Sequence, residues 1–132
     1  MPLVRCDYSS EHFTEDTLRQ FGKIVYDVSA EVCHYSEEDA KNKISIFNTP
    51  FGPLDHSTAS IEVEIRARVA EFDKPGKTRE DVRREWLRAY EAGLIPFAKE
   101  VNLAAPIILT VTFADWEVMV VTSSGSTPNS PN

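Results

Sequence analysis

The sequence has little cysteine and no long hydrophobic run. Cys6 and Cys33 are the only cysteines among 132 residues. They form neither a CxxC motif nor a dense disulfide framework, so we expect two free thiols. No apolar stretch approaches the roughly 20 residues that a membrane-spanning helix needs, and the amino-terminal segment lacks the features of a secretory signal. We therefore expect a cytoplasmic protein without a membrane partner.

Positive charge is in deficit. Fourteen Lys and Arg against 21 Asp and Glu give a net charge of −7, which argues against nucleic acid as a partner. Cations nevertheless gather between residues 66 and 88, and a local cationic pocket on an acidic protein suits a small anionic ligand. The sequence shows no metal-ligand spacing, phosphate loop or serine nucleophile motif. We expect no metal and no cofactor.

Hydrophobic periodicity predicts an α+β domain. A strand over 2–8, a helix over about 15–33 and a strand over 43–49 are followed by a strand over 59–72, a second helix and a strand over 107–120. Thr14 and Thr78 precede acidic first turns and predict the helix starts. The acidic segment 36–39 is expected to be a loop, and Pro96 predicts a kink or break in the second helix.

The two halves suggest an internal duplication. The predicted helix caps lie 64 residues apart, and this shift carries strand 43–49 onto 107–113 and segment 2–8 onto 66–72, so that Pro2 falls on Arg66. We predict one domain over 2–121 made of two βαβ units, 2–58 and 59–121. It has a four-stranded mixed sheet with two helices on one face, followed by a flexible tail over 122–132.

Pro2 is the most informative residue. Removal of Met1 would leave a free proline whose secondary amine stands at the start of a buried strand. Burial would push that amine towards its neutral form, which is suited to general base catalysis. The alternative is that Pro2 merely suits the start of a strand.

A start of Met-Pro followed by apolar residues, a length near 130 and duplicated βαβ units together resemble the tautomerase superfamily. The resemblance covers 2 to about 121 and is greatest to fused, two-unit members such as 5-carboxymethyl-2-hydroxymuconate isomerase, malonate semialdehyde decarboxylase and macrophage migration inhibitory factor. It implies that Pro2 is the base or acid, that cationic side chains bind a substrate carboxylate, and that the chain forms a homotrimer.

The resemblance also suggests substrate-binding residues. Lys43 stands where relatives often have arginine, and Lys77, in Gly76-Lys77-Thr78, resembles the Gly-Arg-Ser of simpler members. Phe51 and Trp116 are candidate pocket aromatics. From the residues themselves, Arg66 and Arg68 share one face of the strand 59–72. They could bind the carboxylate, or could instead pair with Glu62 or Glu64.

These observations predict a cofactor-independent tautomerase or isomerase that acts on a small 2-oxo (enol) carboxylic acid. One alternative is a proline-dependent decarboxylase, hydratase or dehalogenase of the same superfamily. The other is a non-enzymatic, ferredoxin-like module that binds small molecules, because the order βαββαβ also describes that fold. The ferredoxin-like fold separates its parallel strands with a third strand and gives no reason for a terminal proline, so Pro2 distinguishes the two.

Overall fold

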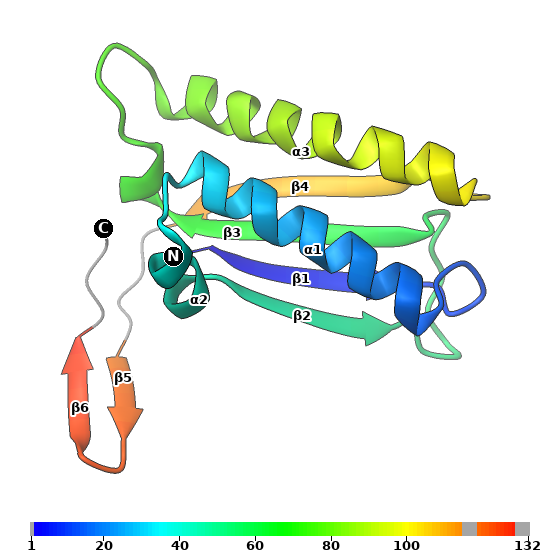
Figure 1. Ribbon diagram of the computed structural model, residues 1–132, viewed down its shortest axis with the longest axis horizontal. Coiled ribbons are helices and arrows are strands. Elements are labelled where there is room, and N and C mark those ends of the chain that lie inside the picture. Colours follow the sequence, from blue (N-terminus) through cyan, green and yellow to red (C-terminus); the bar gives the residue numbers. More distant parts are fainter. Residues whose placement is uncertain (1, 115–118, 129–132) are drawn as a thin grey trace.

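Two long helices cover one face of a four-stranded sheet (Figure 1). The computed structural model describes residues 2–114 and 119–128. The elements in chain order are β1 Leu3–Tyr8, α1 Glu15–Val32, α2 Glu37–Lys43, β2 Ser45–Pro50, β3 Ile61–Arg68, the 3₁₀ helix η1 Val69–Phe72, α3 Arg79–Val101, β4 Ile107–Ala114, β5 Met119–Thr122 and β6 Gly125–Pro128. The expected α+β class is confirmed, with a mixed sheet and the two long helices on one face.

The strand order is β2-β1-β3-β4. β1 pairs in parallel with β2, β3 in parallel with β4, and β1 antiparallel with β3. In each half the two parallel strands are direct neighbours, with no third strand between them. The ferredoxin-like fold of the alternative is therefore wrong. The starts of β1 and β2 and the ends of β3 and β4 meet at one end of the sheet, which we call the proline end because Pro2 lies there.

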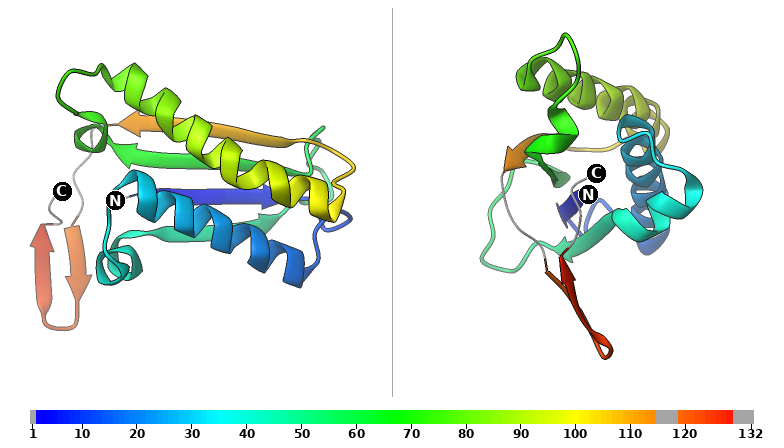
Figure 2. Two further views of the ribbon diagram at one scale, coloured as in Figure 1. Left: turned by 45° about the horizontal axis from the view of Figure 1, so that its top comes forward. Right: turned by 90° about the vertical axis from the view of Figure 1, so that its left-hand side faces the viewer.

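The core lies between the sheet and the helices (Figure 2). Alternate residues of β3 are buried, and the others, including Glu62 and Arg66, face away from the helices. α1 contributes Phe21 and Val25, and α3 contributes Trp86. Burial of such side chains is the main source of stability in a domain of this size.

The helix starts agree with the sequence. Thr14 caps α1 and Thr78 caps α3, each in a capping box whose side chain accepts a hydrogen bond from the backbone N–H three residues on. The acidic residues of each first turn favour the positive end of the helix dipole. Pro96 lies within α3, which continues to Val101, so the predicted break in the helix is wrong, and the predicted kink stays a prediction.

Other expectations need correction. Segment 36–39 is no loop, because Ser36 caps the short helix α2. The predicted strand 59–72 ends at Arg68 and continues as η1, and β4 ends at Ala114. The structural offsets are therefore unequal, since the strands β1 and β3 begin 58 residues apart while α1 and α3 begin 64 apart. Pro2 precedes β1 as Ser60 precedes β3, so the alignment of Pro2 with Arg66 is wrong, and the duplication itself stays a prediction.

The chain beyond β4 contains a separate two-stranded antiparallel ribbon of β5 and β6. The sequence did not predict this ribbon, and the flexibility of the tail over 122–132 stays a prediction. No helix in the described part of the chain is long and apolar enough to cross a bilayer.

Candidate functional site at the proline end of the sheet

Pro2 directly precedes the interior strand β1. Leu3 pairs with Ser45 on one side and with Arg66 on the other, so Pro2 has sheet neighbours on both sides, Ile44 and Ala67. The Ser45 N–H donates a hydrogen bond of 3.3 Å to the Pro2 carbonyl. The Pro2 side chain is fully buried and, by alternation with buried Val4, belongs to the helix-facing side. A proline fits here because no ladder hydrogen bond from its nitrogen is required.

The topology brings three of the predicted cations to the same end. Lys43 is the last residue of α2, two residues before the first residue of β2, and not the first residue of the strand as expected. Arg66 and Arg68 lie at the end of β3, on the face away from the helices. Arg66 Nε lies 3.7 Å from Glu64 Oε1, with about half of each side chain exposed. The alternative of pairing with a neighbouring glutamate therefore describes Arg66 in the single chain, although such exposed pairs are weak.

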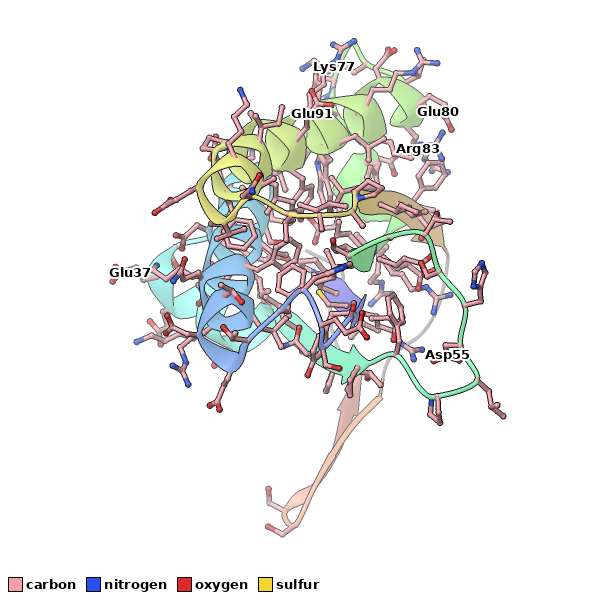
Figure 3. The ribbon with its side chains drawn as sticks, turned by 90° about the vertical axis from the view of Figure 1, so that its right-hand side faces the viewer. Glu37, Asp55, Lys77, Glu80, Arg83 and Glu91 are labelled. Atoms are coloured by element: carbon pink, nitrogen blue, oxygen red, sulfur yellow. The ribbon has the colours of Figure 1, made fainter. Side chains whose placement is uncertain are left out.

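The remaining predicted residues are less directly placed. Lys77 stands in the turn before α3 (Figure 3), near His34 and Lys74, and its Nζ pairs with Glu85 Oε1 at 2.6 Å. Phe51 follows β2 and its N–H donates to the Tyr8 carbonyl, so it lies at the opposite end of the sheet, about 23 Å along the strand from Pro2. Trp116 lies outside the described residues. One chain does not bring Phe51 and Pro2 together.

A tight turn after α1 places Tyr35 at the proline end. His34 has φ of 56°, in the left-handed region that ends many helices. The Tyr35 N–H donates to the Ala30 carbonyl and the His34 N–H to the Glu31 carbonyl. This motif turns the chain back, so that Tyr35 lies between α2 and η1: Lys43 Nζ is 5.4 Å from the centre of its ring, and its hydroxyl donates a 3.1 Å hydrogen bond to Glu71 Oε1.

Sequence analysis missed Glu71, which is only 5% exposed. A signal for it was present, because strict alternation along 59–72 puts residue 71 on the apolar face. There it is the one charged residue among small and branched apolar side chains. In the structure Glu71 is not part of the strand. It is buried because the 3₁₀ helix η1 turns both Glu71 and Phe72 inwards. A buried carboxylate needs hydrogen bonds or positive charge around it.

Cys33 and Tyr35 are the polar neighbours of Glu71. Burial, followed by the negative charge of Glu71, raises the pKa of the Cys33 thiol to about 12. The pKa of Tyr35 is also raised, first by burial and then by the charges of Cys33 and Glu71. Both groups are therefore neutral at physiological pH, which leaves them as hydrogen-bonding groups rather than as a thiolate nucleophile or a phenolate. In the described part of the chain, no cluster of three or more His, Cys, Asp or Glu could hold a metal ion.

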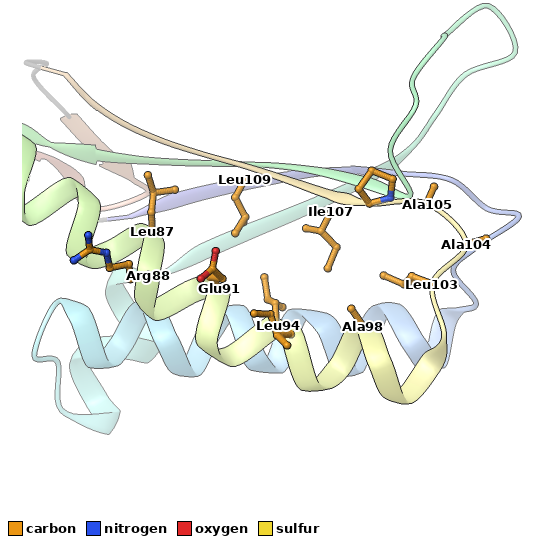
Figure 4. A pocket seen from close by; sticks show the side chains of 12 residues that line it. Leu87, Arg88, Glu91, Leu94, Ala98, Leu103, Ala104, Ala105, Ile107 and Leu109 are labelled. Atoms are coloured by element: carbon orange, nitrogen blue, oxygen red, sulfur yellow. The ribbon is translucent and has the colours of Figure 1, made fainter.

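An apolar groove lies away from the proline end. A groove of about 670 Å³ runs between α3 and β4 and reaches the start of β4, away from the proline end (Figure 4). Apolar side chains such as Leu87, Leu94 and Ile107 line it, and the only ionisable side chains among its lining residues are Arg88 and Glu91. The groove offers apolar surface beside the edge strand, whereas the groups suited to proton transfer gather at the proline end. We place the candidate site at the proline end because of that chemistry.

No family model matches the sequence, and no curated protein matches it significantly. Solved structures do match the fold. A member of the cis-3-chloroacrylic acid dehalogenase family has a TM-score of 0.61 at 9% identity, covering 98% of this chain and 85% of that one. A fused 4-OT protein, solved as a symmetric trimer, has 0.59 at 9% over 93% of both chains. A 5-carboxymethyl-2-hydroxymuconate delta-isomerase has 0.58 at 11% over 88% and 83%. The chain therefore has the tautomerase fold, as the resemblance implied.

Proposed function

We propose that the protein is a cofactor-independent tautomerase that acts on a small 2-oxo (enol) carboxylic acid, with the Pro2 amine as its general base and acid. The observation that carries the proposal is the place of Pro2: it is fully buried directly before an interior strand, in a fold shared with an isomerase. Removal of Met1 is part of the proposal, because it converts the Pro2 nitrogen from a non-basic amide into a secondary amine.

The chemistry needs no co-reactant. The neutral amine takes the proton of the enol hydroxyl, and the C–O bond gains double-bond character as electrons move to the far carbon of the C=C bond. The resulting ammonium then donates its proton to that carbon. The amine is regenerated and the product is the 2-oxo isomer. Such proton transfer by a positioned group contributes about 10²–10⁴-fold to rate.

Cations would hold the substrate and stabilise the developing negative charge. Lys43, Arg66 and Arg68 are the candidates at the proline end. Phe51 could reach a site of this kind only in another subunit, and Lys77 and Trp116 stay predictions. Lysine binds a carboxylate as a point charge, and arginine binds it through two parallel hydrogen bonds. Positive charge beside the oxygen of the enolate lowers the barrier to its formation.

A homotrimer is part of the same proposal. The sheet face that carries Glu62 and Arg66 is uncovered in one chain, and β4 ends the four-stranded sheet beside the apolar groove. Exposed edges and apolar grooves of this kind favour association. A symmetric trimer is the state of one protein with the same fold.

The test compares the wild type with Pro2→Ala. Intact mass first establishes that Met1 is absent, and the ketonisation of 2-hydroxymuconate and of phenylenolpyruvate is then followed by ultraviolet absorbance. We expect kcat/KM to fall at least about 100-fold in Pro2→Ala, because the primary amine is less well placed. Pro53→Ala, at an exposed loop position, is the matched control and should keep full activity. Retention of Met1, or equal activity of wild type and Pro2→Ala, would refute the proposal.

A further inference from the structure

Glu71 is the one charged side chain among the buried residues of the described chain; the other buried polar residues are Ser29 and Ser60. Burying a carboxylate costs several kcal/mol unless hydrogen bonds and positive charge offset the loss of water. The Tyr35 hydroxyl supplies one hydrogen bond at 3.1 Å. A group that is costly to bury and that lies in a candidate site is itself a candidate for a functional role.

The sheet register directs the segment that contains Glu71 past Pro2. Since β1 and β3 are antiparallel and Leu3 pairs with Arg66, the chain that leaves β3 passes the residue that precedes β1. The nitrogen of Pro2 points back along β1, in the direction in which β3 continues into η1. Glu71 follows Ala67, the neighbour of Pro2, by four residues, which is about 10 Å of chain with a 3₁₀ rise. η1 and α2 lie on either side of the start of β1 (Figure 1).

The surroundings fix the position of the carboxylate. Tyr35 is held by the turn after α1, its ring packs under Lys43 Nζ at 5.4 Å, and its hydroxyl bonds Glu71. η1 is anchored by Phe72, whose ring centre lies 4.5 Å from that of Trp86. The other titratable or charged groups around this end include Cys33 and His34 after α1, Lys43 on α2, Arg66 and Arg68 on β3, and Asp73, Lys74 and Lys77 after η1.

We propose that Glu71, oriented by the Tyr35 hydroxyl, is the positioning residue for the Pro2 amine: once Met1 is removed, its carboxylate accepts a hydrogen bond from the protonated amine and holds the nitrogen in place. This inference rests on the proposed role of Pro2.

Glu71 affects which protonation state of the Pro2 amine the site favours. Burial and nearby cations favour the neutral amine, whereas a carboxylate within about 4–6 Å favours the ammonium and raises the pKa by one to three units. Glu71 therefore opposes the lowering of the pKa that the cation cluster alone predicts. Removing its charge should lower the pKa of the Pro2 amine and move the acid limb of the pH–rate profile to lower pH.

The experiment titrates the amine directly. In protein labelled with ¹⁵N-proline, the Pro2 amine gives a signal distinct from the amide nitrogens of the other prolines, and its shift against pH gives the pKa. We expect Glu71→Gln to lower that pKa by about one unit or more. Glu71→Asp, which keeps the charge, should restore at least half of the difference. Glu62→Gln removes the same charge from the open face near the far end of β3 and should change the pKa by less than about 0.3.

A measurement on the wild type removes the dependence on folding of the variants. With ¹³C-labelled glutamate, the Glu71 carboxylate signal should shift in the same pH range in which Pro2 loses its proton. A Pro2 pKa that is equal in wild type and folded Glu71→Gln, or a carboxylate signal that ignores the Pro2 titration, would overturn the inference. Coupled titration in a protein that is inactive towards enol acids would support the pairing and refute the tautomerase proposal alone. Retained Met1 would overturn both.

Discussion

The hydrogen bond between Ser29 and Tyr90 joins the two long helices inside the core. The two hydroxyl oxygens are 2.7 Å apart, and both residues are 0% exposed. In Tyr90→Phe the Ser29 hydroxyl loses this partner, but a serine within a helix can bond the carbonyl four residues earlier. We therefore expect the free energy of unfolding to fall by about 1–2 kcal/mol, the lower part of the range for a buried group left unpaired.

Ser29→Ala should cost at least as much, about 2 kcal/mol, because the Tyr90 hydroxyl is then buried without that partner. The double variant leaves no hydroxyl unpaired, so its loss should be about 1 kcal/mol smaller than the sum of the two single losses. With a urea m-value of about 2 kcal/mol/M, each single change should lower the unfolding midpoint by about 0.5–1 M.

The assay is urea unfolding followed by circular dichroism at one fixed protein concentration, since assembly would make stability depend on concentration. Tyr26→Phe, at a partly exposed tyrosine of α1, is the control and should change stability by less than about 0.5 kcal/mol. If the loss of unfolding free energy in the double variant equals the sum of the two single losses, the inference that the two hydroxyls stabilise the helix pair through each other is refuted.

Two further predictions concern stability. Gly22→Ala should raise the free energy of unfolding by about 0.5–1 kcal/mol in the same urea assay, because a Cβ at Gly22 meets no atom within 4 Å and alanine favours the helix; a loss of stability would contradict this. Burial raises the pKa of both Cys6 and Cys33 from 9.0 to about 12, so the folded state keeps two protons that the unfolded chain releases above pH 9. Stability should therefore be unaffected by these thiols below pH 9 and fall between pH 9 and 12, by up to about 1.4 kcal/mol per pH unit for each thiol. Urea unfolding at pH 8.5, 9.5 and 10.5 tests this. In Cys6→Ala the decrease of the unfolding free energy with pH should be smaller by the equivalent of about one proton. An unchanged pH dependence in Cys6→Ala would show the reasoning to be wrong.

The elements that sequence analysis predicted correctly are those whose signals are local. Thr14 and Thr78 identify the helix starts through side-chain caps, and the alternation of β3 identifies its buried face. The helix α2 was missed because Ser36 and the three acidic residues after it read equally well as a polar loop. Its stability comes from the cap and from the burial of Ala40, and that burial depends on tertiary packing.

The candidate site was predicted only in part. Pro2 could be singled out because its chemistry is a property of chain position, and the parallel pairing that brings Lys43 to the same end follows from the βαβ order. Glu71 and Tyr35 could not be paired in advance, because their contact depends on a 3₁₀ turn that continues no periodic pattern and on a left-handed His34. The role of Phe51 came from a short resemblance rather than from strand direction, and because one chain places it far from Pro2, that role stays a prediction.

The strand that is synthesised first occupies the interior of the sheet. β1 has β2 on one side and β3 on the other, and β3 is some fifty residues further along the chain. While the ribosome is still making the second half, the first half can form its parallel pair, but one full edge of β1 and the inner faces of Val4 and Cys6 stay without their final neighbours. Bare edges of this kind recruit other chains. The nascent protein is thus exposed to self-association until β3 emerges, and a fragment that ends before residue 61 should aggregate rather than fold.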